Sequence, residues 1–270
     1  MAEETKDFGE QLFPVPPKVR EKAYIKSKEE YQKLYDESVK DPDKFWAKIA
    51  ERIDWFKKPT KICDFSFKPP VYVKWFEDGE LNVSYNCLDR QIKNGRKNKA
   101  AIIFEGNDPS DNKTYTYMDM YREVNKFANV LKKHGIKRGD RVTIFLPMIP
   151  ELAIAMLACT RIGAIHCIVF GGFSSDALKE RIVDSESKLL ITCDGTFRGA
   201  KAVPQKDNAD KALAECPNVS RQIVVKRTGT QCAWKEGRDL WWEDEMKTVP
   251  YYCEPEKMKA EDPLFILYTS

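Results

Sequence analysis

The chain has 270 residues, enough for one large α/β domain or two modest ones with buried cores. Hydrophobic residues make up 42% and charged residues 32%, a composition that indicates a globular protein and excludes a disordered one. The 45 basic and 42 acidic residues nearly balance, so we predict no nucleic-acid partner, for which a clustered basic excess is expected.

The cysteine and histidine content argues against a metal centre. Eight cysteines and two histidines are present, and no two cysteines form the C-x-x-C pair that is common in zinc sites. The start, MAEETKDFGEQLF, lacks the basic residues and apolar run of a signal peptide. No window has the apolar length of a membrane span. We therefore predict a reducing, cytoplasmic setting and no membrane partner.

The segment 1–70 is charged and interrupted by prolines. Within it, residues 41–56 place apolar side chains at helical spacing behind an Asp-Pro pair, which predicts an amphipathic helix. Residues 72–95 indicate a turn and then a helix that ends at Gly95. We predict that the first segment is an extension packing on a main body, which is an α/β subdomain at 71–270.

From residue 99 onward, strand-like and helix-like segments alternate. Runs rich in Val, Ile and Leu predict strands at 99–106, 141–147, 164–172, 188–195 and 221–227. Helices are predicted between them at 114–135, 150–163, 174–185 and 208–216, and Thr116-x-x-Asp119 resembles a capping box. This alternation predicts the α/β class, with a mostly parallel sheet flanked by helices and right-handed crossovers.

Ligands of such sheets bind beyond the carboxyl ends of the strands, and a first informative loop lies after the strand at 164–172. Phe170 ends the apolar run, Gly171 and Gly172 let the backbone turn or approach another group, and Ser174 can cap the next helix. Two interpretations stay open for these residues. They form either a binding site for a polar or anionic ligand, or a turn that only packs the helix on the sheet.

A second loop, DGTFRGAK at 194–201, also follows a predicted strand. Arg198 and Lys201 flank the small residues Gly199 and Ala200, so the backbone can approach a phosphate while two cations neutralise it. The alternative is a solvated basic loop, because surface charge is common. The position after a parallel strand favours the phosphate interpretation.

The last stretch, EDPLFILYTS, places an apolar run at 264–268 behind a proline and in front of Thr269 and Ser270. One interpretation is a buried core strand with two polar residues after it. The other is that Thr269 and Ser270 begin a loop whose N–H groups and hydroxyls bind a nucleotide phosphate. Such a strand resembles the start of a functional loop, so we expect this chain to be the N-terminal portion of a longer protein.

Two further features are predicted to be structural. His166 stands in the middle of the apolar stretch AIHCIV, where a packed core histidine is expected. Trp234, Trp241 and Trp242 resemble a stacking platform, but we favour a helix that docks its aromatic edge on the domain.

A wider resemblance emerges from several stretches taken together. They are 75–90 (WFEDGELNVSYNCLDR), 139–174, 198–201 (RGAK), 237–242 (GRDLWW) and 261–270 (EDPLFILYTS). In this order they resemble the AMP-forming acyl-CoA synthetases of the adenylate-forming (ANL) superfamily, most closely the acetyl-CoA synthetases. The resemblance covers nearly everything from about residue 30 onward.

This resemblance implies a ligase reaction in two steps. Acetate attacks the α-phosphorus of ATP to give an acetyl-adenylate and pyrophosphate, and the CoA thiolate then attacks the acyl carbon and expels AMP. ATP, CoA and Mg²⁺ are the implied substrates and cofactor, with no tightly bound group. In the family the small C-terminal domain, absent from this chain, reorients between the steps.

The family's binding residues carry over onto matching positions. Arg198, Gly199, Ala200 and Lys201 match the loop for the CoA 3′-phosphate, and Phe170, Gly171 and Gly172 match the wall beside the CoA adenine. Thr269 and Ser270 match the start of the ATP phosphate loop. Ala200 replaces a glycine that close relatives often carry. The acyl pocket, magnesium ligand and adenylation lysine fall outside the chain, so no catalytic or metal residue is assigned and the chain alone is expected to be inactive.

Other functions remain open at this point. The RGAK stretch favours acetate, whereas a propionyl-CoA synthetase is an alternative. A further alternative is an inactive CoA-binding or assembly module. A dinucleotide-binding dehydrogenase is disfavoured, because no G-x-G-x-x-G follows an early strand. Oligomeric state is not indicated by the sequence.

Overall fold

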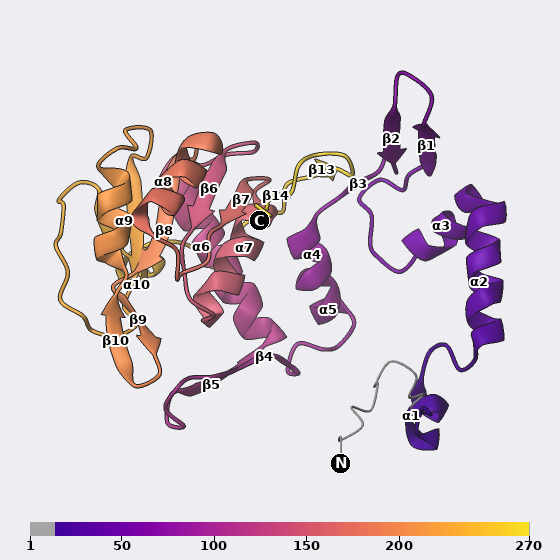
Figure 1. Ribbon diagram of the computed structural model, residues 1–270, viewed down its shortest axis with the longest axis horizontal. Coiled ribbons are helices and arrows are strands. Elements are labelled where there is room, and N and C mark those ends of the chain that lie inside the picture. The colour runs from indigo at the N-terminus through magenta and orange to yellow at the C-terminus, as the bar shows by residue number, and fades with distance from the viewer. Residues whose placement is uncertain (1–13, 270) are drawn as a thin grey trace, which may run out of the picture. The chain divides into compact units, whose positions relative to one another are not determined.

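Residues 14–269 are described in the computed structural model of the protein, which is shown in Figure 1. The chain divides into two compact units after Arg52. The sequence-predicted boundary near residue 70, and the packing of the first segment on the second, stay predictions. Ser270, a predicted site residue, lies outside the described part.

The first unit consists of short helices. They are α1 (Pro17–Lys22), α2 (Lys28–Lys40) and α3 (Pro42–Ala50). The Asp41 carboxylate caps α3 by accepting the Lys44 N–H at 3.1 Å, and Pro42 occupies the first turn, so the predicted start of this helix is confirmed. The helix ends at Ala50, earlier than predicted, because the Arg52 N–H turns back to the Ile49 carbonyl in a tighter turn.

The second unit is built on a six-stranded, wholly parallel sheet. In spatial order the strands are β12 (Asp239–Trp241), β11 (Arg221–Val225), β8 (Leu189–Cys193), β6 (Arg141–Ile144), β7 (Ile165–Ile168) and β14 (Phe265–Ile266). Every residue of β8 is buried, as expected for a central strand covered on both faces. The predicted α/β class with a flanked parallel sheet is confirmed.

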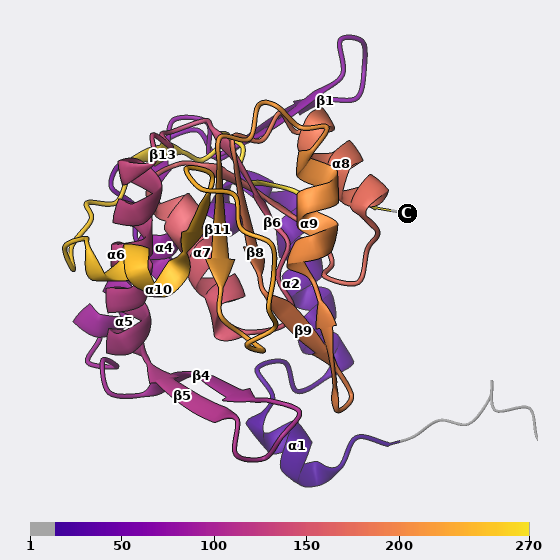
Figure 2. The ribbon, with the colours of Figure 1, turned by 90° about the vertical axis from the view of Figure 1, so that its left-hand side faces the viewer.

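Helices cover both faces of the sheet (Figure 2). One face carries α6 (Tyr117–Lys133), α7 (Pro150–Arg161) and α10 (Trp242–Lys247), and the other carries α8 (Ser175–Asp184) and α9 (Lys206–Leu213). The predicted capping box is confirmed, because Thr116 and Asp119 exchange side-chain to backbone hydrogen bonds at the start of α6.

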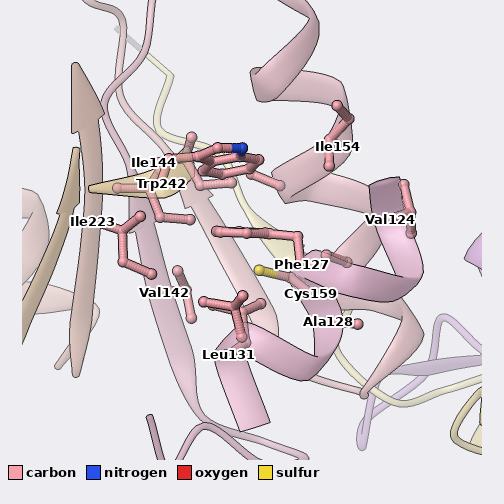
Figure 3. Packing of buried hydrophobic residues seen from close by; sticks show 14 of the residues in the cluster. Val124, Phe127, Ala128, Leu131, Val142, Ile144, Ile154, Cys159, Ile223 and Trp242 are labelled. Carbon is pink, nitrogen blue, oxygen red and sulfur yellow. The ribbon is translucent and has the colours of Figure 1, made fainter. Parts of the chain in front are cut away.

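An apolar core lies between α6, α7, α10 and the sheet (Figure 3). Trp242, at the start of α10, stacks on Phe127 of α6 with ring centroids 3.7 Å apart. Both side chains are buried, and burying a side chain of this kind contributes about 1.5–3 kcal/mol. Trp242 therefore docks its helix on the domain, as predicted, whereas Trp234 and Trp241 stack on each other at 4.4 Å.

Two sequence predictions about strands are corrected. The strand expected at 99–106 does not join the parallel sheet, since β4 (Ala100–Glu105) pairs antiparallel with β5 (Asn112–Thr116). The connection is too short for a crossover, and the Gly106 N–H closes it on the Asp111 carbonyl at 2.7 Å. The strand expected to be buried at 264–268 is β14 at the sheet edge, where Phe265 is 51% exposed.

Several short elements were not predicted individually. They are β1 (Cys63–Ser66) with β2 (Tyr72–Trp75), β3 (Glu80–Leu81) with β13 (Met258–Lys259), β9 (Gly195–Arg198) with β10 (Lys201–Pro204), and the helices α4 (Val83–Cys87) and α5 (Asp89–Lys93). The helix predicted before Gly95 is thus two helices. Within 14–269, every helix is too short or too polar to cross a bilayer.

His166 in β7 is a packed core residue, as predicted. It is 3% exposed, its ring stacks on that of Phe265 with centroids 5.6 Å apart, and its Nδ1 has no hydrogen-bond partner among the described residues. Burial lowers the pKa of the imidazole to about 4, so the ring is neutral near pH 7.

This histidine predicts a pH dependence of stability. An unfolded histidine has a pKa of about 6.5, so between about pH 6.5 and 4 the unfolded state binds more protons. The contribution of the neutral His166 to the free energy of unfolding is therefore fully present above that window. It falls by up to about 1.4 kcal/mol per pH unit as the pH drops through the window. Chemical denaturation across this range should show a shallower decline for His166→Leu. Parallel curves for wild type and His166→Leu would contradict the prediction.

Candidate functional site

The strand order indicates which end of the sheet is a candidate for ligand binding. The chain passes from β6 to β7 on one side and returns through α8 to β8 on the other side of β6. Because α7 covers one face and α8 and α9 cover the other, the direction of winding changes between β6 and β8. Ligands of open parallel sheets bind beyond the carboxyl ends of the strands at such a switch point. The loops after β7, β8 and β14 all leave at this edge.

Asp194 organises the loops at this edge, and sequence reasoning assigned it no role. It is 1% exposed, and its carboxylate accepts N–H groups from Gly195 at 2.7 Å, Arg227 at 2.8 Å and Gly229 at 2.8 Å. One buried carboxylate thus fixes the loop after β8 against the loop after β11. Its only signal in the sequence is an Asp-Gly pair directly behind a buried strand.

The predicted loop at 194–201 is a β-hairpin. Strands β9 and β10 pair antiparallel, and Arg198 lies directly opposite Lys201 across a two-residue turn of Gly199 and Ala200. Gly199 has φ +60° and Ala200 is not among the residues with positive φ, which is the pattern of a type II′ turn. A glycine is favoured at the first turn position because it adopts this φ without strain.

Arg198 and Lys201 form an electropositive pair at the tip of this hairpin. Directly opposite residues project from the same face of a two-stranded sheet. Both side chains are exposed, and neither has a hydrogen bond or ion pair within 14–269. Like charges in this arrangement repel each other, so an anion between them would be favourable.

The loop after β7 lies beside this pair. A Cβ atom added at Gly172 would lie 3.1 Å from Arg198 Nη2 and 2.6 Å from Phe170 Cε1. The Phe170 ring is 68% exposed and meets Phe173 edge-on with centroids 5.8 Å apart. The structure therefore brings Phe170, Gly172 and Arg198 together from two loops, with an open aromatic face beside a guanidinium.

The hairpin is anchored where β10 enters α9. Gln205 is 2% exposed and donates from Nε2 to the Phe145 carbonyl at 2.7 Å, and a Cβ at Gly171 would lie 3.3 Å from that Nε2. Lys206, wholly buried, binds Asp239 at 2.8 Å. Although burial alone would raise the pKa of Asp239, its hydrogen bonds to Arg238 and Lys206 lower that pKa overall.

The end of β14 is held by α8. The Arg181 guanidinium lies 4.8 Å from the Phe173 ring centroid and 5.1 Å from that of Tyr268. The Tyr268 hydroxyl donates to Asp184 at 2.5 Å, and burial together with this bond raises the pKa of Tyr268. Thr269 follows β14 and is exposed. Because β14 and β7 run parallel, Thr269 lies at the same carboxyl end of the sheet as Phe170.

The described residues offer no metal-binding cluster. Among residues 14–269, no group of three or more His, Cys, Asp and Glu side chains is arranged to hold an ion. The carboxyl end of the sheet does carry the electropositive pair of Arg198 and Lys201, with the exposed Phe170 ring nearby.

Two family models together match most of the sequence. One, described as AMP-binding enzyme, matches residues 88–270. The chain belongs to this family. The other, described as acetyl-coenzyme A synthetase N-terminus, matches residues 31–87, so the two matches meet between α4 and α5, inside the second unit.

Curated relatives agree with this membership. Acetyl-coenzyme A synthetase of Mesorhizobium japonicum is 58% identical over 244 residues, which are 89% of this chain and 37% of the relative. That of Rhizobium rhizogenes is 55% identical over 268 residues, 97% of this chain and 41% of the relative. The chain thus spans 37–41% of the length of these relatives.

A solved structure is similar in fold. Acetoacetyl-CoA synthetase from Streptomyces lividans superimposes with a TM-score of 0.79, covering 93% of this chain and 38% of the other at 23% identity. This similarity concerns the arrangement of the elements.

The turn geometry predicts different effects of two substitutions at Gly199. Gly199→Ala should destabilise the hairpin by about 1–2 kcal/mol, since alanine disfavours positive φ, while the space around the position is open. Gly199→Asn should cost less because asparagine tolerates this conformation. Amide hydrogen exchange of residues 201–203 measures the effect, and equal exchange in the two variants would contradict the assigned turn.

Proposed function

We propose that this chain forms the N-terminal portion of an AMP-forming acetate–CoA ligase. The complete enzyme joins acetate to ATP as an acetyl-adenylate with release of pyrophosphate, and then transfers the acetyl group to the CoA sulfur with release of AMP. The proposal is supported by family membership and by relatives named acetyl-coenzyme A synthetase along most of the chain. A cytoplasmic setting and acetate rather than propionate as the acid belong to the same proposal.

The observation that carries the proposal is a cation pair that has no ion-pair partner within residues 14–269 and lies beside an exposed ring. CoA bears a 3′-phosphate next to an adenine, so its recognition needs cations for the phosphate and a flat apolar surface for the base. Arg198 offers a planar fork for phosphate oxygens and Lys201 a point charge, and Phe170 offers an open ring beside them. Gly172 leaves room for the guanidinium, and Gly199 and Ala200 let the turn approach the phosphate.

In this proposal the chain binds and orients, and the reacting groups come from elsewhere in the enzyme. Holding CoA at the sheet edge directs its thiol toward the adenylate and turns the second step into an intramolecular one. Thr269 and Ser270 are proposed as the first residues of the ATP phosphate loop, on the strand next to β7. Mg²⁺ would accompany ATP to spread charge on the phosphoryl group.

Substitution of Arg198 tests the proposal in the full-length enzyme. Arg198→Ala should weaken CoA use by about 10- to 150-fold, because a charge-assisted hydrogen bond contributes about 1.5–3 kcal/mol. Acetate-dependent ATP–pyrophosphate exchange, which reports the first step alone, should remain nearly intact. Steady-state thioester formation and isotope exchange measure the two steps.

The control is Lys211→Ala, which removes an exposed positive charge from α9 without touching the cation pair. It should leave both steps unchanged. If Arg198→Ala reduced exchange as much as thioester formation, the assignment of this hairpin to the CoA step would be wrong. Failure of the enzyme to form acetyl-CoA from acetate, ATP and CoA would reject the function itself.

A further inference from the structure

The β9–β10 hairpin has two faces with different surroundings. Side chains alternate along a strand, so Phe197 projects from the face opposite that of its neighbour Arg198. The Arg198 face carries the cation pair. On the opposite face, the Phe197 ring lies over the Arg227 guanidinium with 5.3 Å between guanidinium carbon and ring centroid.

Arg227 is itself held from several sides. Its guanidinium forms an ion pair with Asp111 at 2.5 Å and lies 5.3 Å from the Phe104 ring centroid as well, so it contacts two rings. Its side chain is only 17% exposed, and its backbone N–H donates to Asp194 at 2.8 Å. The Arg227 guanidinium is thus directed at Asp111 and packed against aromatic rings. It therefore acts as a support for the hairpin and is not free to bind an anion.

The hairpin turn is tied to the same neighbour. Asn107, in the loop between β4 and β5, donates from Nδ2 to the Gly199 carbonyl at 2.5 Å. Both ribbon views show the β4–β5 pair at the end of the sheet where the hairpin projects (Figures 1 and 2). A cavity of about 780 Å³, lined by Asn107, Asp111, Phe197, Gly199 and Arg227 among others, opens between them.

Because of this open space, the position of the hairpin depends on the few contacts that it makes on this side. An isolated two-stranded hairpin is marginally stable, so its position depends on what it packs against. Here the supports on the Phe197 side are the Arg227 guanidinium and the Asn107 amide, with a cavity beside them. Because both faces belong to one two-stranded ribbon, we expect a shift of the Phe197 face to change the position of Arg198 relative to Gly172.

We propose that Asn107, Asp111, Arg227 and Phe197 form a clamp that positions Arg198 for the CoA 3′-phosphate without touching CoA. The inference rests on the proposed function and adds positioning residues to the proposed CoA site. The β4–β5 pair, which lies outside the parallel sheet, thereby gains a role in substrate affinity.

The test uses the full-length enzyme with three clamp variants. Phe197→Leu keeps an apolar side chain without the ring, Arg227→Lys keeps the charge without the planar fork, and Asp111→Asn keeps the shape without the charge. Each should raise KM for CoA by about 3- to 30-fold, the range that corresponds to a partly desolvated cation–π contact. The kcat at saturating CoA and the acetate-dependent ATP–pyrophosphate exchange should stay unchanged.

A matched control is the ion pair of Arg141 and Glu186, also 2.5 Å long, at the start of β6 and thus at the opposite edge of the sheet. Arg141→Lys makes the same chemical change there and should leave KM for CoA unchanged. Thermal denaturation of all variants identifies any that are misfolded, since a general loss of structure lowers kcat and exchange together.

Two further measurements separate positioning from simple structural support. With 3′-dephospho-CoA as substrate, the clamp variants should match the wild type, because no phosphate remains for Arg198 to bind. In an Arg198→Ala background, Phe197→Leu should add no further increase in KM. Additive effects, or an equal loss with 3′-dephospho-CoA, would overturn the clamp.

The remaining outcomes distinguish the clamp from the proposed function. If Arg198→Ala weakens CoA use as expected but the clamp variants leave KM for CoA unchanged, the clamp alone is overturned. An unchanged KM for CoA in Arg198→Ala itself overturns the clamp and the assignment of the hairpin to the CoA 3′-phosphate. The ligase function is rejected separately, by failure of the wild-type enzyme to form acetyl-CoA. A parallel loss of kcat, exchange and melting temperature in the clamp variants assigns these residues to folding and also overturns the inference.

Discussion

The buried carboxylate of Asp194 is the constraint on which the geometry of the site depends. It accepts N–H groups of Gly195, Arg227 and Gly229, and a buried carboxylate is stable only when such donors surround it. The bond to Gly195 fixes where the hairpin begins, and the bond to Arg227 fixes the support on which the hairpin rests. The positions of both faces of the hairpin therefore follow from one side chain at the end of β8.

The alternation of side chains along β9 then places the proposed binding residues and their proposed support on opposite faces of the hairpin. Arg198 and Lys201 face outward together, where their mutual repulsion is unfavourable until an anion arrives. Phe197 and Arg227 stay together on the other face through ring and guanidinium contacts. Because neither side chain forms an ion pair within residues 14–269, no such pair has to break when the two cations take up a phosphate.

The sequence predicted those parts of the fold that local patterns determine. The capping box at Thr116, the core position of His166 and the parallel strands follow from residues close together in the chain. The partner of β4 was mistaken because an apolar run does not reveal which strand it pairs with. The role of Asp194 was missed because two of its donors, Arg227 and Gly229, lie more than thirty residues further along the chain.

The two proposed substrate loops share a support that the sequence did not indicate. Arg181 lies between Phe173, which follows the proposed CoA wall, and Tyr268, which precedes Thr269. Because Asp184 on the same helix accepts the Tyr268 hydroxyl, α8 holds the end of β14 at two points. Among the described strands β14 pairs only with β7, and Phe265 in it is 51% exposed. Helix α8 thus supports both the loop after β7 and the end of β14, while the pairing of β14 with β7 sets their register. The hairpin that follows β8 approaches the β7 loop from the other side of that loop's strand.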